Sequence, residues 1–429
     1  ARALGYVLAE EAWGHGYATE AAQRVLSFAF EEFGLELVSV CHFPFNARSR
    51  RVIEKCGFRY EGTIRHAYRR YDNTVLDSCC YSIMREEYLA LKANVQNVAL
   101  RGAQRIIAIS DVHGNGHLLQ RLLEQIGFSA KDALVLLGDH IEKGCGSLYT
   151  LRFIKSLCEA GNAYALQGNC DTLWEDLKSG LYGVDLVRYM DWRKQSLLCD
   201  MCAELGLDVH ACPPEEIRFR LEKAYGDLFA WLAGLPHIIE SEDLIFVHAG
   251  LDAGDLHAQN AERCLRRDDF LHEAPVFEKF VIAGHMPTSN YSDLTGDILT
   301  CNPVFDFHRK IICIDGGNGV KRSGQLNALI LENGMFSTAW ADELPQAVVL
   351  HAQEASPEPA SIAWQHKEIE LLAAGNSESL CRCLYTGRTL LTPNEKLFLC
   401  NGRQCSYDHT DYWLPLSAGD IVSIVEEGQ

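Results

Sequence analysis

Six residues of metal-binding type each follow or closely trail a short apolar run in the middle of the chain: Asp111, His113, Asp139, Asn169, His248 and His285. Two carboxylates, one amide oxygen and three imidazoles form a donor set without thiolate, which suits Mn, Fe or Zn better than Ca or a structural zinc. Six ligands are enough for two ions, and Asp139, in the middle of the series, could bridge ions about 3.5–4 Å apart. Because such a pair activates a water and binds a phosphoryl oxygen, this pattern favours hydrolysis of a phosphate ester.

Five apolar runs must position these side chains, and they occupy residues 105–110, 133–138, 163–168, 244–247 and 280–284. Short runs of aliphatic and β-branched residues are typical of buried strands. The polar residues then stand at the carboxyl ends of strands, where open α/β sheets gather their ligands. We therefore expect the six side chains to converge.

The motifs stand in a recognisable order: Asp111-Val-His113-Gly-Asn, Gly138-Asp139-His-Ile-Glu-Lys-Gly144, Gly168-Asn169-Cys-Asp171, His248-Ala-Gly250 and Gly284-His285. This series resembles the calcineurin-like metallophosphoesterases, and by pattern the phosphoprotein phosphatases and symmetrical bis(5′-nucleosyl)-tetraphosphatases among them. The resemblance covers about residues 102–342. It implies an α/β fold, the metallophosphoesterase βαβ sandwich.

The resemblance also implies roles for individual residues. Asp111, His113 and Asp139 would hold the first ion, and Asp139, Asn169, His248 and His285 the second, with a bridging hydroxide as the nucleophile. Lys143 stands where the family places an arginine that binds substrate phosphate; it is cationic but lacks the bidentate fork of arginine. Arg267 is the candidate for a second phosphate-binding arginine, and Asn169 would also lie near the phosphate.

Cys170 departs from the family, which has a histidine here that protonates the leaving group with an acidic partner. Glu142 stands at the position of that partner, so Cys170 and Glu142 join Asp139 as candidate catalytic residues. A thiol with a reference pKa of about 8.5 is a different acid from imidazolium. His140 is an alternative acid. Asp171 is either catalytic or, as we favour, the N-cap of the helix that follows.

Residues 1–92 carry a second resemblance, to the carboxyl-terminal half of the GNAT-type N-acetyltransferases. Gly5-Tyr-Val-Leu predicts a strand, Trp13-Gly14-His-Gly16 a glycine turn, and residues 19–33 an amphipathic helix. A glycine turn that opens a helix can bind a pyrophosphate. The resemblance implies acetyl-CoA contacts from Gly14, Gly16 and Asn46. Because the earlier strands of that family are missing and the chain starts at Ala1, we expect either a degenerate remnant or part of a longer, bifunctional protein.

The remaining segments complete the predicted domain plan. Residues 93–104 predict a linker, 105–345 the phosphoesterase domain, 346–362 a second linker, and 363–429 a small β-rich domain of unknown role, for which interaction or oligomerisation is a guess from form alone. Residues 171–236 predict a helical insertion, with helical periodicity over 181–198 and 217–231. This insertion is either a cap over the site, which we slightly favour, or ordinary core.

Composition limits the partners. With 39 basic and 58 acidic residues the net charge is −19, which argues against nonspecific binding of nucleic acid or anionic membranes. The 17 cysteines show neither disulfide-framework nor zinc spacing, and with no apolar leader or long apolar run this predicts a reducing, cytoplasmic setting. Phosphoproteins, dinucleoside polyphosphates and small phosphomonoesters all stay open as substrates, and the oligomeric state stays open too. An acetyl-CoA-dependent transferase within a longer parent and a non-catalytic metal-binding scaffold are the rival hypotheses.

Overall fold

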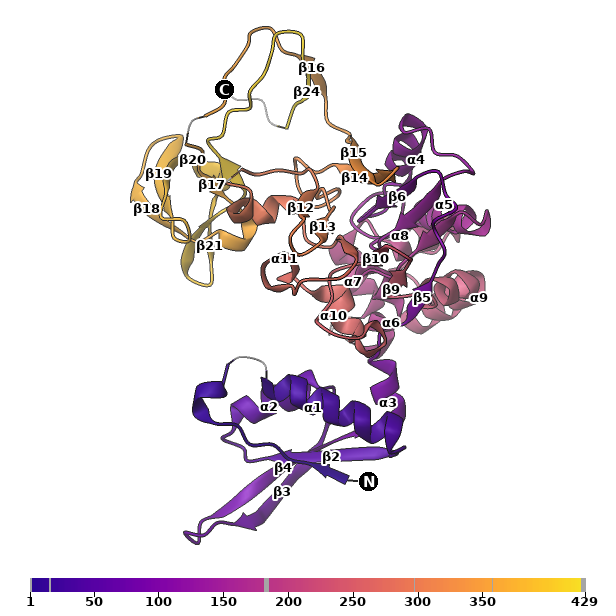
Figure 1. Ribbon diagram of the computed structural model, residues 1–429, viewed down its shortest axis with the longest axis vertical. Helices are drawn as coiled ribbons and strands as arrows, with labels where there is room; N and C mark the ends of the chain where they lie inside the picture. The colour runs from indigo at the N-terminus through magenta and orange to yellow at the C-terminus, as the bar shows by residue number, and fades with distance from the viewer. Residues whose placement is uncertain (1, 15–16, 181–184, 297, 357, 426–429) are drawn as a thin grey trace. The chain divides into compact units, whose positions relative to one another are not determined.

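The computed structural model describes residues 2–14, 17–180, 185–296, 298–356 and 358–425 (Figure 1). The chain divides into two compact units. One comprises residues 1–93 and 254–262, and the other residues 94–253 and 263–429.

Two large sheets form the main part of the larger unit. The five-stranded sheet has the order β15-β14-β6-β7-β8, with β6 at Ile106–Ile109, β7 at Ala133–Leu136, β8 at Ala163–Ala165, β14 at Leu326–Glu332 and β15 at Met335–Ala341. The six-stranded sheet has the order β12-β13-β11-β10-β9-β5, with β5 at Val95–Asn97, β9 at Ile238–Glu240, β10 at Leu244–Val247, β11 at Phe280–Ala283, β12 at Val304–Asp306 and β13 at Ile311–Cys313. Strands β6, β7 and β8 are parallel, as are β10, β11 and β13. The predicted α/β sandwich is confirmed, and the five apolar runs are divided between its two sheets.

Alternation along the strands explains why the sheets stack. Ile107 and Ile109 of β6 belong to a core cluster shared with helices, whereas Ala108 between them belongs to a cluster that includes Phe246 and Ile282 of the other sheet. Successive side chains of a strand point to opposite faces, so a run that is apolar throughout must be covered on both sides. The sheets cover each other on one face, and helices cover the other face of the β6 sheet.

Helices α4, Gly116–Gln125, and α5, Ser147–Glu159, follow β6 and β7 and lie beside that sheet (Figure 1). The segment predicted as a helical insertion is confirmed as helical, with η3 at Cys170–Thr172, α6 at Leu173–Ser179, α7 at Leu186–Arg193, α8 at Leu197–Glu204 and α9 at Pro214–Ala233. Residues 181–184, where the first helical pattern was predicted to begin, lie outside the described residues. Leu198, Leu221 and Phe229 belong to the same core cluster as β6. The insertion is therefore part of the main core, and a cap over the site stays a prediction.

Short helices connect the later strands. The turn η4 at Leu256–Ala258 belongs to the smaller unit, and α10 at Ala261–Arg266 begins there and ends in the larger unit. The larger unit also contains α11 at Phe270–Glu273 and η5 at Thr288–Leu294. Arg105 precedes β6 and forms a bidentate pair with Asp132, which precedes β7, at 2.9 and 2.8 Å. The same guanidinium donates to the carbonyl oxygens of Ile126 and Gly127 at the end of α4. One arginine thus joins the starts of two strands to a helix end.

Both predicted linkers need correction. Residues 95–97 form β5 and pair in parallel with β9, so the predicted linker 93–104 is partly built into a sheet. In the predicted linker 346–362, β16 at Gln346–Val348 pairs with β24 at Ile421–Ser423, and β17 at Ser361–Ile362 pairs with β23 at His409–Thr410. The strands that pair with β16 and β17 are far away in sequence, so the local composition of the predicted linker could not reveal these pairings.

The carboxyl-terminal segment is a small β domain, as predicted. It has a three-stranded sheet of β18, Ile369–Ala373, β19, Glu378–Cys383, and β20, Thr389–Pro393, and a hairpin of β21, Leu397–Cys400, and β22, Arg403–Ser406. Short helical turns η6, Trp364–His366, and η7, Asn394–Lys396, connect them. Alternate residues of β19 are buried, and Cys381 and Cys383 pack with Ile362, Ile369 and Leu390.

The smaller unit is a four-stranded sheet of order β1-β2-β4-β3, with β1 at Arg2–Leu4, β2 at Leu37–His42, β3 at Arg59–Arg69 and β4 at Val75–Met84. Its helical segments are η1, Glu10–Ala12, α1, Tyr17–Ser27, η2, Phe28–Glu32, α2, Ala47–Lys55, and α3, Arg85–Ala90. The helix predicted over 19–33 is thus α1 followed by the π-helical turn η2. Leu26, Phe30, Ile53 and Ile83 form its core. Over the described parts of the whole chain, no helix combines the length and apolarity needed to cross a bilayer.

Candidate metal centre

The six predicted ligands follow strand ends of both sheets. Asp111 and His113 come after β6, Asp139 after β7, Asn169 after β8, His248 after β10 and His285 after β11. Asp111, His113, Asp139 and His285 all have positive φ, between 47° and 66°. This left-handed conformation is uncommon for residues other than glycine and clusters at functional sites, where surrounding structure imposes it.

A close approach between the loops after β7 and β8 requires a glycine. A Cβ added at Gly168 would collide with the backbone nitrogen of Asp139. Any side chain at position 168 would therefore push Asp139 away from the groups that surround it.

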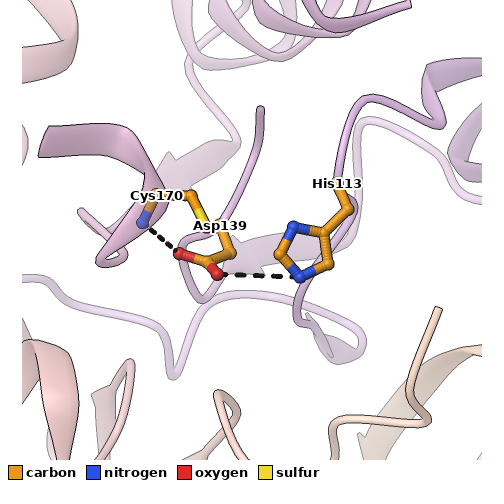
Figure 2. A group of neighbouring side chains, drawn as sticks. All are labelled: His113, Asp139 and Cys170. Carbon is orange, nitrogen blue, oxygen red and sulfur yellow. Dashed lines mark hydrogen bonds and ion pairs between the residues drawn. The ribbon is translucent and has the colours of Figure 1, made fainter. Parts of the chain in front are cut away.

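Asp139 lies at the centre of the cluster (Figure 2). Its Oδ2 is 3.6 Å from His113 Nε2. Its Oδ1 is 3.4 Å from His248 Nε2. The backbone N–H of Cys170 donates to Oδ1 at 2.8 Å. Burial opposes ionisation of this carboxyl, but His248, His113 and Lys143 outweigh it and hold the pKa of Asp139 below its usual value. Each oxygen of Asp139 thus faces a different imidazole, which is one of the arrangements in which a carboxylate bridges two cations.

Backbone carbonyls orient two of the imidazoles. His248 Nδ1 is 2.7 Å from the carbonyl oxygen of Leu137, and His113 Nδ1 is 3.4 Å from that of Ile141. With Nδ1–H donating to a carbonyl, the lone pair of each ring stands on Nε2, the nitrogen that faces Asp139. Burial, followed by the charge of Lys143, lowers the pKa of His113 to about 3, so its ring is neutral at physiological pH and able to bind a cation.

Asp111 provides the test of whether a cation fits. Its Oδ2 accepts the backbone N–H of His285 at 3.0 Å and the hydroxyl of Ser110. Its Oδ1 is buried and has no hydrogen-bond partner among the described residues. Burial, together with the charge of Asp139, raises the pKa of Asp111 to about 7. A buried acceptor without a donor is rare in proteins, and a divalent cation would satisfy it.

Two overlapping groups of potential ligands therefore share Asp139. In one, ligand atoms of Asp111, Asp139 and His248 all lie within 4.8 Å of one another, and in the other those of His113, Asp139 and Cys170 do. Asn169 joins the first group, since its Oδ1 is 3.1 Å from His248 Nε2. The ring of His285 lies 5.0 Å from that of His248, centroid to centroid. The donor chemistry of this cluster suits two divalent cations.

Lys143 reaches the ligands themselves. Its Nζ lies 3.0 Å from His113 Nε2 and 3.9 Å from Asp139 Oδ2. Burial disfavours the charged amine, but the negative charges of Asp139 and Asp111 outweigh it and raise the pKa of Lys143. A permanent cation stands next to the cluster, on the side of His113.

Arg267, the predicted second phosphate-binding residue, is 5 % exposed and directed into the protein. Its guanidinium donates to the carbonyl oxygen of Leu251 and to the carboxylates of Asp252 and Asp269. These contacts indicate a structural role and give no support to a phosphate contact. Its neighbour Arg266 lies nearer the ligands, because it donates to the carbonyl oxygen of Asn169 at 3.3 Å.

Glu142 lies against the insertion helices. Tyr189 of α7 donates its hydroxyl to one carboxylate oxygen at 2.8 Å, and the N–H of Leu197 in α8 donates to the other at 2.9 Å. Burial raises the pKa of Glu142 to about 7. The prediction that Glu142 is the acidic partner of Cys170 is not supported, since both of its oxygens are engaged on the side of the helices.

Cys170 offers a backbone donor and a buried thiol. Its N–H binds Asp139, and its Sγ lies 3.6 Å from Asn169 Nδ2. Burial, together with the charge of Asp139, raises the pKa of the thiol. The side chain is therefore protonated and weakly acidic in this environment.

Two further predictions concern residues beside the ligands. The N-cap role of Asp171 is wrong: Thr172 precedes α6, and Asp171 instead accepts the N–H groups of His140 at 2.9 Å and Gly168 at 2.8 Å. It thereby joins the loops after β7 and β8, a long-range role that no local pattern could reveal. His140 is fully buried with Nε2 at 2.9 Å from the carbonyl oxygen of Leu166, which argues against a role as solvent-accessible acid.

The acetyl-CoA candidates lie in the smaller unit. Gly14 has φ 84° in an exposed turn before α1, and Gly16 lies outside the described residues. The Asn46 side chain accepts the N–H of Ser49 at 3.1 Å and so caps α2. Capping accounts for Asn46 without a ligand.

The two-sheet α/β sandwich and its centre of carboxylates, imidazoles and an amide define a metallophosphoesterase domain. Residues 104–316 match the family model of the calcineurin-like phosphoesterases. Residues 2–59 match the acetyltransferase (GNAT) domain. Both family resemblances expected from the sequence are thereby confirmed.

Individual proteins agree with this division. The symmetrical bis(5′-nucleosyl)-tetraphosphatase of Vibrio campbellii is 31 % identical over 144 residues, which is 33 % of this chain and 43 % of that protein. The uncharacterized N-acetyltransferase YoaA of Bacillus subtilis is 34 % identical over 82 residues, 19 % of this chain and 46 % of that protein. A crystal structure provisionally described as a diadenosine tetraphosphatase is 21 % identical, covers 58 % of this chain and 99 % of its own, and has a TM-score of 0.39. The chain spans about half the length of the curated relatives it matches.

Proposed function

We propose that the chain is a hydrolase of phosphate esters that uses two divalent ions, with Asp139 as the bridging ligand. The observation that carries this proposal is the placement of Asp139, whose two oxygens face His113 and His248 at 3.6 and 3.4 Å. The buried, unpartnered Oδ1 of Asp111 supports it. In this assignment Asp111, His113 and Asp139 hold one ion, and Asp139, Asn169, His248 and His285 hold the other.

The donors of this site suit Mn, Fe and Zn, and the chemistry that two such ions would supply is activation of a water and neutralisation of charge on the phosphoryl oxygens. The residues of the chain do the rest. Backbone carbonyls fix the tautomers of His113 and His248, Lys143 adds a positive charge beside the phosphoryl group, and Asn169 places its amide beside the second ion. Preorganised charge of this kind lowers the barrier where negative charge grows.

We favour a nucleotide phosphoester, of the dinucleoside polyphosphate class, as the substrate. The relative from Vibrio campbellii is named for that class, and its match falls on the phosphoesterase domain. The chemistry of Cys170 also favours it, since a nucleotide phosphate leaves readily without strong protonation, whereas an alkoxide such as that of phosphoserine does not. Phosphoproteins and small phosphomonoesters are the alternative substrates.

The test is a phosphate-release panel on purified protein reconstituted with Mg, Mn, Zn or Fe. It would contain diadenosine tetraphosphate, a phosphoserine peptide and a chromogenic aryl phosphate. We expect hydrolysis of the tetraphosphate and the aryl phosphate, and little of the phosphopeptide. No hydrolysis with any metal, or equal rates for wild type and Asp139→Asn, would instead favour the metal-binding scaffold.

A second candidate activity rests on the match of residues 2–59 to the acetyltransferase (GNAT) domain. In a longer parent protein this segment would contribute the acetyl-CoA site, with Gly14, Gly16 and Asn46 as its candidate contacts. Isothermal titration of this chain with CoA tests whether the segment alone retains binding. A Gly14→Ala variant should abolish any binding found, because φ 84° at that position is strained for alanine.

A further inference from the structure

The three histidines of the metal centre are oriented in two different ways. His113 and His248 direct Nδ1 toward backbone carbonyl oxygens, which carry no charge and cannot be altered by mutation. His285 instead places Nε2 at 3.0 Å from Oδ1 of Asp268. Its ring is therefore oriented by the side chain of an aspartate and not by a backbone carbonyl.

Asp268 lies in the turn between α10 and α11, close to buried residues on both sides. On one side Arg267 is buried and bound to Leu251 and Asp252, and on the other Phe270, the first residue of α11, is fully buried. The side chain of Asp268 is nevertheless 75 % exposed, whereas that of His285 is 14 % exposed. One ion pair of an exposed carboxylate adds little to stability. The contact of Asp268 with a candidate metal ligand therefore points to a role in positioning that ligand.

We propose that Asp268 is a positioning residue for His285, an inference that rests on the dinuclear centre proposed above. By accepting the Nε2 proton, Asp268 fixes the tautomer in which Nδ1 carries the lone pair, and Nδ1 is then the nitrogen available to the second ion. The negative charge also makes the imidazole a stronger donor. Carboxylates that bind metal-ligating histidines commonly contribute a factor of about 10–100 to metal affinity.

The carboxyl-terminal β domain contacts this turn. Gln365 in η6 donates from Nε2 to the backbone carbonyl oxygen of Asp268 at 3.3 Å. The bond is to the main chain, so it restrains the position of the carboxylate without consuming it. The domain to which no chemistry could be assigned from the sequence thus reaches a ligand of the second ion through one intervening residue.

The test is a titration of metal-free protein with Mn²⁺, followed by isothermal calorimetry and by electron paramagnetic resonance of the free ion. For Asp268→Ala we expect the dissociation constant of one ion to rise about 10–100-fold while that of the other stays within about 3-fold, because His285 serves only one site. Asp268→Asn should give a smaller rise, since its amide oxygen can still accept the proton, and Asp268→Glu should restore part of the loss. Gln365→Ala should shift the same constant by less than Asp268→Ala does.

Asp243→Asn is the matched control, because Asp243 is also an exposed carboxylate in an ion pair, with Arg101. It should leave both constants unchanged. Equal Mn²⁺ affinities for wild type and Asp268→Ala would overturn the inference, and so would a wild type that binds fewer than two ions. A wild type that binds two ions but hydrolyses no substrate would refute the proposed function. The change of the Mn²⁺ dissociation constant in Asp268→Ala would still test the role of Asp268 independently.

Discussion

Replacing Asp139 with asparagine is the sharpest perturbation of the proposed centre, because it removes one oxygen and the charge while keeping the size. The N–H of Cys170 donates to Oδ1 at 2.8 Å, so the amide oxygen of the variant must stay on that side. The amide NH₂ then takes the place of Oδ2 and faces His113 Nε2, 3.6 Å away in the wild type. A group with two donor hydrogens cannot bind a cation, and the bridge between the two sites is lost.

The magnitude follows from what a bridging carboxylate supplies. Loss of one ion removes several kcal/mol of stabilisation of the charge that grows on phosphate. If the loss is about 4 kcal/mol, kcat/KM falls about 10³-fold, since about 1.4 kcal/mol corresponds to a factor of ten. The assay is aryl phosphate hydrolysis with Mn²⁺, together with metal analysis of the dialysed protein, and we expect one bound ion or none where the wild type holds two.

A folded Asp139→Asn protein that keeps both ions, or keeps activity within about 10-fold of wild type, would refute the bridging role. Circular dichroism and thermal unfolding separate this outcome from misfolding. Asp243→Asn makes the same chemical change at an exposed ion pair and should match the wild type in both assays.

Three further predictions concern proton chemistry and stability. Burial raises the pKa of folded Glu142 to about 7 from an unfolded value near 4.5, so the folded state holds the proton more tightly. Relative to Glu142→Gln, the wild type should therefore lose about 3 kcal/mol of unfolding free energy between pH 4.5 and pH 7. Urea unfolding measures this difference, and a difference that does not change with pH would contradict the prediction. Cys170→Ala should change the rate of diadenosine tetraphosphate hydrolysis by less than about 3-fold, whereas Cys170→His should raise the rate of alkyl phosphate hydrolysis about 10²-fold. A rate loss of about 10²-fold in the alanine variant would instead identify the thiol as the proton donor. Arg105→Met should destabilise the fold by about 2–3 kcal/mol, because it leaves the carboxylate of Asp132, which is 1 % exposed, without its cation. Denaturant unfolding of this variant, of Asp132→Asn and of the double mutant measures the coupling free energy between the two residues.

The positions of the ligand-bearing loops could be predicted because each depends on a local pattern. A run such as Leu244–Val247 is apolar at every position, which predicts a strand covered on both faces, and His248 must then stand at its end. The order of five such units predicts the fold. That these units divide between two sheets depends on pairing between distant strands, such as β14 with β6, which no local window contains.

Local residue types were a poor guide to the direction in which neighbouring side chains point. Arg267 and Asp268 are adjacent, and the turn between α10 and α11 decides that the arginine points inward while the aspartate meets His285. Their residue types alone favoured the arginine as the functional one. In the same way Asp171 precedes a helix and looks like a cap, but its two hydrogen-bond donors come from loops after different strands.

The contact between position 170 and Asp139 has an evolutionary consequence. The carboxylate of Asp139 is held there by the main-chain N–H, which every amino acid except proline supplies. A lineage could therefore exchange the side chain at this position, and with it the group that delivers a proton, without disturbing the ions. Single substitutions at this position could therefore change which leaving groups the protein accepts, while the candidate metal ligands stay the same.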